Sequence, residues 1–147
     1  MRAYRIGSIR HPLWDGNGAM LNGARWNSPG RGPIYAAETY SGAMLEMLVR
    51  MGSVTVPPEL YYIQIEIPDH LAVEEATATP GEMAKESITR ARGDKWYDAR
   101  KSAILLVPSV VTRVDRNVLL NPRHPDFNKI QPSEPKPVWW DPRLFRS

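Results

Sequence analysis

Residues 39–51 carry the sequence Thr-Tyr-Ser-Gly-Ala-Met-Leu-Glu-Met-Leu-Val-Arg-Met, in which apolar side chains recur at i, i+3, i+4 and i+7. This spacing is typical of one face of an α-helix, and Gly52 is a natural helix stop. Leu45 and Val49 lie off the main apolar stripe. The helix is therefore apolar almost all round, and we expect it to be largely buried.

Glu46 is the exceptional residue of this helix, because nearly all of its neighbours are apolar. Burying a lone carboxylate costs several kcal/mol unless the group is paired or used. One interpretation is a surface ion pair with Arg50 at i+4, which contributes only a few tenths of a kcal/mol. The other is a functional carboxylate, and the helix alone does not separate the two.

Short extended segments lie on both sides of the helix. The segment 61–67 alternates, with isoleucines on one face and polar residues on the other, as in a half-exposed strand. The full set of expected strands is 3–6, 33–37, 61–67, 103–107, 117–120 and a last strand within 138–145. Together with the helix they predict an α+β domain of many short strands.

The remaining segments are more polar. Residues 7–23 are rich in Gly, Asn and Pro and predict a long loop. Residues 81–92 predict a polar surface helix, and 94–101 a separate short helical turn. The β-branched stretch 110–114 follows the buried strand 103–107.

Length and composition limit the possibilities further. A chain of 147 residues with 42% apolar content forms one core, so we expect a single domain over residues 1–147. No run approaches about 18 apolar residues and no signal peptide opens the chain, so we expect a cytoplasmic protein without membrane contact. The absence of cysteine excludes disulfides, thiolate metal sites and cysteine nucleophiles.

The charged residues favour a small ligand over a nucleic acid. The net charge is +3, and arginines outnumber lysines by 14 to 5. Arginine suits phosphate and carboxylate groups because its planar fork donates two parallel hydrogen bonds. A nucleic-acid binder more often carries a basic stripe, which this chain lacks. The pattern is that expected for a phosphate-bearing small molecule.

Four polar or aromatic residues outside the helix are candidates for a site. Arg25 and Trp26 lie in the glycine-flanked segment Gly-Ala-Arg-Trp-Asn-Ser-Pro-Gly, where the arginine can reach a phosphate and the indole can stack. The alternative is a turn in which Trp26 anchors the core and Arg25 is solvated. Arg5 on the first strand and Ser109 after Pro108 are equally open to a structural interpretation, and no Gly-x-Ser-x-Gly elbow surrounds Ser109.

Other common kinds of site are disfavoured. The histidines His11, His70 and His124 have no metal-ligand spacing, so we predict no metal. The sequence has neither a phosphate loop nor a dinucleotide glycine fingerprint, which disfavours hydride transfer on a Rossmann fold.

The order of several short motifs resembles the RES-domain family, named for an arginine, a glutamate and a serine. These motifs are Tyr4-Arg5, Gly23-Ala24-Arg25-Trp26-Asn27, Gly30, Tyr35-Ala36-Ala37, Ala43 to Glu46, Val107-Pro108-Ser109 and Asn117 to His124. One departure is Ile6, where some relatives place an aromatic residue. The family comprises bacterial toxins, usually encoded beside a Xre-type antitoxin, that consume NAD⁺. The implied fold is similar to that of ADP-ribosyltransferase toxins, with a split, twisted mixed sheet around an NAD⁺ cleft.

The resemblance also implies roles for individual residues. It makes Glu46, Arg25 and Ser109 the expected catalytic residues. Arg5, Arg25, Tyr35, Trp26 and Asn121 are then expected to bind NAD⁺, which is a substrate, so no resident cofactor is expected. The implied reaction is cleavage of the nicotinamide–ribose bond, whose oxocarbenium-like transition state a nearby carboxylate stabilises.

The acceptor of ADP-ribose stays open at this point. Water or inorganic phosphate ranks first, which makes the protein an NAD⁺ glycohydrolase or phosphorylase, and a protein side chain ranks second. A hypothesis of another class is a nucleic-acid-binding or RNA-acting toxin that uses the basic ends and five tryptophans. An inert interaction module is the third. We expect an antitoxin as protein partner and no direct nucleic-acid contact.

Overall fold

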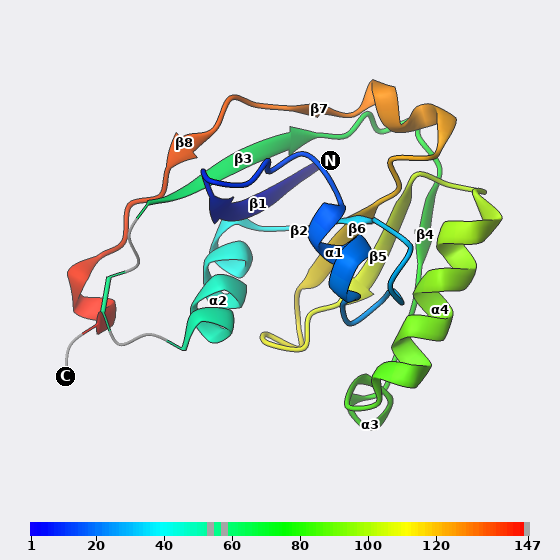
Figure 1. The fold of residues 1–147 in the computed structure, drawn as a ribbon, viewed down its shortest axis with the longest axis horizontal. Coiled ribbons are helices and arrows are strands. Elements are labelled where there is room, and N and C mark those ends of the chain that lie inside the picture. The colour runs from blue at the N-terminus through cyan, green and yellow to red at the C-terminus, as the bar shows by residue number, and fades with distance from the viewer. Residues whose placement is uncertain (53–54, 57–58, 146–147) are drawn as a thin grey trace.

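The computed structural model describes residues 1–52, 55–56 and 59–145. Within them one mixed sheet has the strand order β4-β5-β6-β2-β1-β3-β7, with β8 paired to β3 (Figure 1). The strands are β1 Arg2–Ser8, β2 Ile34–Ala37, β3 Leu60–Glu66, β4 Val73–Glu75, β5 Ile104–Pro108, β6 Arg116–Leu120, β7 Gln131–Pro132 and β8 Lys136–Pro137. The helices are α1 Asn17–Asn22, α2 Tyr40–Met51, α3 Pro80–Met83 and α4 Glu86–Ala99, with 3₁₀ helices η1 Pro125–Lys129 and η2 Pro142–Phe145. The expected α+β class is confirmed.

The sheet is joined at its middle by a single residue pair. β1 pairs with β3 along its whole length, from Arg2↔Glu66 to Ser8↔Leu60. β2 likewise pairs with β6 along all four of its residues. Between β1 and β2, in contrast, the described residues pair only at Tyr4↔Ala37. The sheet is therefore split beside this pair, which agrees with the implied fold.

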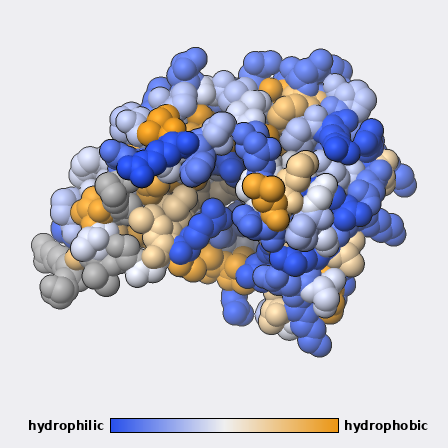
Figure 2. Space-filling view, in the orientation of Figure 1, coloured by the Kyte–Doolittle hydropathy of each residue, from blue (hydrophilic) through white to orange (hydrophobic). Residues whose placement is uncertain are grey.

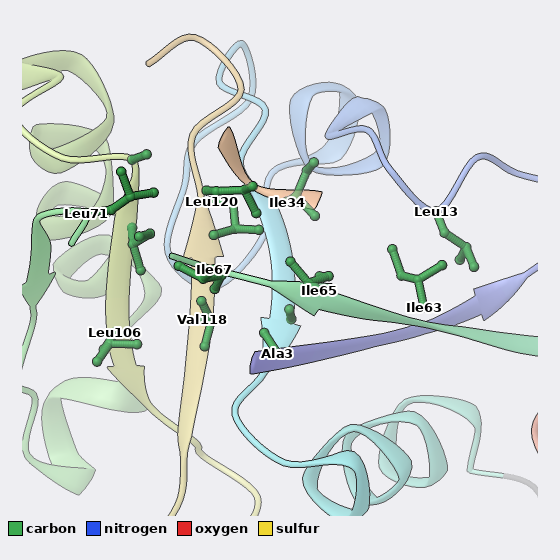
Figure 3. Close-up of a cluster of buried hydrophobic side chains, with 14 residues drawn as sticks. Ala3, Leu13, Ile34, Ile63, Ile65, Ile67, Leu71, Leu106, Val118 and Leu120 are labelled. Carbon is green, nitrogen blue, oxygen red and sulfur yellow. The ribbon is translucent and has the colours of Figure 1, made fainter. Parts of the chain in front are cut away.

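The main core lies on one face of the sheet and draws on both halves. Ile34 of β2, Ile63 and Ile65 of β3, and Leu120 of β6 are at most 2% exposed and belong to one cluster (Figure 3). Burying each such side chain contributes about 1.5–3 kcal/mol. The alternation predicted for residues 61–67 is confirmed, since the isoleucines face this core. The two halves of the split sheet thus share a core although they barely share hydrogen bonds.

α2 covers the opposite face of β1 and β3, but it is less buried than expected. Thr39 caps its first turn by accepting from the Gly42 amide, and Gly52 ends it in the left-handed region at φ 58°. Ala43 packs against Ile6, yet Leu45 and Val49 are 45% and 64% exposed. The prediction of a largely buried helix is wrong because only one side of α2 meets the sheet.

Four local predictions also need correction. The expected loop 7–23 contains α1, and the expected separate helices 81–92 and 94–101 are replaced by the short α3 and one continuous α4. Residues 110–114 form turns and bends, and the tail ends in η2 where a strand was expected, although Trp140 is buried. The sequence of α4 predicts two shorter segments because its buried face lacks a regular apolar pattern. That face consists of Thr89, Gly93, Trp96 and Tyr97.

No helix in the described part of the chain has the length and apolar character that crossing a membrane requires.

Candidate active-site cleft

A cleft of about 630 Å³ opens where the sheet is split. This volume lies within the range of roughly 300–1,000 Å³ that is usual for small-molecule sites. Its walls come from β1, β2, α1, α2, and the segments that follow β5 and precede β2. Figure 2 shows a hollow near the centre of this face, with hydrophilic and apolar side chains around it. Its lining includes Arg5, Arg25, Tyr35, Glu46 and Asn117.

Glu46 is half-buried at the wall formed by α2, and its carboxylate is held on one side. The Ser109 hydroxyl donates to Oε1 at 2.8 Å, and the Asn117 amide Nδ2 donates to the same oxygen at 2.9 Å. Across residues 1–52, 55–56 and 59–145, Oε2 has no hydrogen-bond partner and no ion pair joins Glu46 to Arg50. The interpretation of Glu46 as half of a surface ion pair is therefore wrong.

The Ser109 hydroxyl is fully used by these contacts. It is 1% exposed, and besides donating to Glu46 it accepts from the amides of Val111 and Thr112 at 3.2 and 3.1 Å. A hydroxyl has one proton and two lone pairs, so no further hydrogen bond is open to it. In this arrangement Ser109 holds Glu46 and is not free to bind a ligand or attack one.

Arg5 reaches from β1 into the gap between β1 and β2. Its NH1 donates to the backbone oxygen of Tyr35 at 2.8 Å, whereas its buried Nε has no partner. Burial is the main factor that lowers the pKa of Arg5 from its usual value, and the nearby charge of Arg50 lowers it further, whereas the charge of Asp15 opposes this shift. Within the described ranges no carboxylate forms an ion pair with either arginine. Because a largely desolvated cation without an ion-pair partner is costly, this corner of the cleft is suited to an anion.

Arg25 lies on the opposite wall, in a segment held by α4. Its NH1 donates to the backbone oxygen of Met83 at 2.6 Å. The Thr89 hydroxyl donates to the Arg25 backbone oxygen, and Arg90 Nε donates to that of Ala24 at 2.9 Å. Gly93 brings α4 close to the same segment, because a Cβ built there would lie 1.7 Å from the Trp26 oxygen. The position of Arg25 is therefore set by α4.

Two of the predicted site residues, Trp26 and Asn121, have side chains that are buried in the protein. Trp26 borders the cleft, but it is only 2% exposed and packs with Trp96 and Leu105, so its indole anchors the core, as the alternative interpretation held. Asn121 is fully buried and does not line the cleft. Its side chain donates to the Tyr97 oxygen and accepts from the Arg123 amide. We therefore retain neither Trp26 nor Asn121 as a ligand-binding residue.

Tyr35 lines the cleft but uses its hydroxyl within the protein. The hydroxyl donates to Asn27 Oδ1 at 2.8 Å and accepts from the Trp26 amide at 3.0 Å. Burial raises the pKa of Tyr35 above that of an ordinary tyrosine, so the hydroxyl remains a donor at neutral pH. Tyr35 thus connects β2 to the segment that carries Arg25.

Tyr35→Phe is expected to destabilise the protein by about 1–3 kcal/mol, because it leaves one buried donor and one buried acceptor without partners. The free energy of unfolding in urea is the measurement. Tyr61→Phe is the matched control, since Tyr61 packs against the main core and the described contacts give its hydroxyl no hydrogen bond. Equal losses in the two variants would contradict the connecting role of the Tyr35 hydroxyl.

Sequence reasoning missed two residues of the cleft. Asn117 was part of a family motif but was not singled out, because an asparagine near a strand start is usually unremarkable. Arg50 was considered only as a partner for Glu46, although it lines the cleft itself. Within the described ranges no group of three or more His, Cys, Asp or Glu side chains is arranged to hold a metal ion.

The family model and the sequence relatives agree on one family, and a solved structure shares the fold. A family model described as the RES domain matches residues 2–141. A Prs ADP-ribosylating toxin of Sphingobium sp. is 34% identical over 138 residues, covering 89% of this chain and 86% of the relative. Toxin Res of Yersinia enterocolitica is 36% identical over 151 residues, covering 98% of this chain and 99% of the relative. Among solved structures, the crystal structure of the M. tuberculosis MbcT-MbcA toxin-antitoxin complex matches with a TM-score of 0.72 at 19% identity, covering 98% of this chain and 86% of that one.

Proposed function

Because this chain belongs to the RES-domain family, we propose that it is a toxin that cleaves the bond between the nicotinamide and the ribose of NAD⁺. The observation that carries this proposal is one cleft that holds both Arg5, a half-buried arginine whose Nε has no partner in the described structure, and Glu46, a carboxylate with one unpartnered oxygen. Arg5 is suited to bind a phosphate, and Glu46 is suited to stabilise a developing positive charge. NAD⁺ offers both, because it carries a diphosphate and its ribose becomes positively charged as nicotinamide leaves.

Glu46 would act on the ribose. When the bond to nicotinamide breaks, its electron pair leaves with the ring nitrogen, and positive charge develops on the ribose as an oxocarbenium-like ion. Oε2 of Glu46 would stabilise this charge, either through a ribose hydroxyl or by its field at the anomeric carbon. The effect is stronger in a half-buried site than in water. Nicotinamide leaves as a neutral molecule and needs no proton, so the step requires no resident cofactor.

The arginines would hold the diphosphate. Arg5 and Arg50 come from two different elements and approach each other closely enough that the charge of one lowers the pKa of the other, Arg5. Two such cations without carboxylate partners would both gain from a bound anion. Arg25 would contact the same ligand from the opposite wall. Holding the dinucleotide on both sides removes much of the entropic cost of positioning before reaction.

Arg50→Gln is expected to raise KM for NAD⁺ about fivefold with little change in kcat, because an exposed charge contact contributes about 1 kcal/mol. Stability should be unaffected, since Arg50 is exposed and forms no ion pair in the described part of the chain. Arg123→Gln is the matched control, as it removes the same charge from an exposed site outside the cleft. An equal KM for both variants would remove Arg50 from the binding site.

The acceptor of ADP-ribose would be water or inorganic phosphate. A bond then forms between the acceptor oxygen and the anomeric carbon as the nicotinamide bond breaks. A second candidate is transfer to a protein side chain, which is favoured by the likeness to a relative named as a Prs ADP-ribosylating toxin. The described partner of the structurally similar MbcT is an antitoxin. We propose a partner of that kind, of the Xre type, for this chain.

The decisive experiment is incubation of the purified protein with NAD⁺, with and without phosphate. Release of nicotinamide, together with mass analysis of the products, separates free ADP-ribose from its phosphorylated form. Adding a cell extract and labelled NAD⁺ tests transfer to protein. Intact NAD⁺ under all three conditions would refute the proposal. Salt-sensitive RNA binding in the same preparation would favour a nucleic-acid-directed toxin instead.

A further inference from the structure

We propose that Asn117 is a positioning residue for Glu46, which together with Ser109 fixes one carboxylate oxygen and thereby directs the other into the cleft. This inference rests on the proposed function, because it assigns Glu46 the role described above. Asn117 does not need to touch the substrate in order to act. Its contribution is to the orientation of the group that does.

Both neighbours of Oε1 are donors, and the geometry fixes this. Asn117 Nδ2 lies 2.9 Å from Oε1, and an amide nitrogen has no lone pair available to accept. The Ser109 hydroxyl receives the Val111 and Thr112 amides on its oxygen, so its single proton is left for Glu46. The arrangement is complementary to an ionised Glu46 whose Oε1 accepts two hydrogen bonds. Only Oε2 remains for a ligand.

The two donors stand on rigid parts of the fold. Asn117 lies in β6, where it is paired on one side with Val107 of β5 and on the other with Ala37 of β2. Ser109 follows β5 directly. A carboxylate held by a single donor can still turn about its last side-chain bond, whereas a second donor, one in β6 and one directly after β5, restricts this rotation. Such preorganisation is most effective when the supporting groups are themselves immobile.

The surrounding charges do not replace this support. Arg50 lies one turn further along α2, Arg5 lies on β1, and Arg25 lies in the segment before β2. In the described structure none of the three forms an ion pair or hydrogen bond with Glu46. They act on the ligand and on the overall potential of the cleft, while orientation of the carboxylate depends on Asn117 and Ser109.

Asn117→Leu is the first test, because it preserves volume and removes the donor. We expect kcat for NAD⁺ cleavage to fall about 10- to 100-fold while KM stays within about twofold, since the ground state does not need the oriented oxygen. Asn128→Leu, at an exposed site outside the cleft, is the control and should leave both constants unchanged. A Leu variant with wild-type kcat would overturn the inference, as would a loss confined to the fraction of folded protein.

Asn117→Asp supplies a readout that a purely structural role would not produce. When the new carboxyl is protonated it can donate to Glu46, and when it is ionised it faces a second carboxylate at about hydrogen-bond distance and repels it. Activity of this variant relative to wild type should therefore fall as pH rises, whereas that of the Leu variant should stay low at every pH. Parallel profiles for the two variants would contradict the proposed donor role.

Different results would contradict the proposed function and the role of Asn117. If the wild-type protein leaves NAD⁺ intact, the proposed function fails, and a crystal structure of Asn117→Leu then decides about Asn117. Support would be a Glu46 carboxylate that has rotated or left Ser109. An unchanged carboxylate at the present 2.8 Å from the Ser109 hydroxyl would refute the positioning role.

Discussion

Glu46→Gln is expected to lower kcat for NAD⁺ cleavage by about 10²- to 10³-fold, with stability close to that of the wild type. The amide is nearly isosteric with the carboxylate, and its oxygen can still accept from Ser109 and Asn117 as Oε1 does now. The group directed into the cleft then becomes an NH₂, which offers no negative charge to the ribose. Removing one preorganised electrostatic contact of this kind typically costs about 3–4 kcal/mol in the transition state.

The measurement is single-turnover release of nicotinamide, corrected for the folded fraction. Glu134→Gln is the matched control, since Glu134 is exposed, lies outside the cleft and undergoes the same change of charge. KM should change little for either variant, because the effect of Glu46 is confined to the transition state. A Glu46→Gln enzyme that retains more than a tenth of wild-type kcat would refute the proposed role.

Gly93→Ala is expected to destabilise the protein strongly. A Cβ at this position would lie 1.7 Å from the Trp26 oxygen and 2.7 Å from the attached carbon, both of which are backbone atoms. α4 would have to move away from the segment 24–27, at a cost of about 1–3 kcal/mol or more. Because Thr89 and Arg90 hold that segment from the same helix, the position of Arg25 would change as well.

Thermal and urea unfolding report the loss of stability, and KM for NAD⁺ in the folded fraction reports the displacement of Arg25. Gly81→Ala is the control, because Gly81 is also helical and the nearest atom to its added Cβ would be Thr79 Oγ1 at 4.0 Å. That variant should be neutral or more stable by up to about 1 kcal/mol. If both alanines are equally tolerated, the close approach of α4 does not hold the Arg25 segment.

The sequence was sufficient to predict those helices and strands whose hydrophobic pattern lies within the element itself. α2 was predicted from its apolar spacing and from Gly52 as a stop, and the structure adds Thr39 as the residue that caps its first turn. The strands β3 and β5 were recognised from alternation and from a continuous apolar run, respectively. In each case the chain contains the whole signal within a few residues.

The predictions failed where contacts with residues distant in the sequence determine which side chains are buried. α4 buries Gly93 and Thr89, which have no apolar periodicity, because its partner is a backbone segment and not a layer of side chains. Leu45 and Val49 are exposed because the sheet reaches only one side of α2. The same reason applies to the site. Glu46 and Arg5 are selected by unusual local context and family resemblance, whereas the role of Asn117 is recognisable only through its contact with Glu46 across 71 positions.

The cleft lies where the sheet is least stabilised by backbone pairing, because β1 and β2 pair only at Tyr4↔Ala37 in the described residues. Neighbouring strands elsewhere in the sheet are joined by several backbone hydrogen bonds. Between β1 and β2 most of these bonds are missing, and the cleft occupies the space. A dinucleotide that contacts both Arg5 and the Arg25 segment would connect the two halves of the sheet. The bound dinucleotide would then stabilise the contact between the two halves of the sheet. Release of the products would remove this stabilisation.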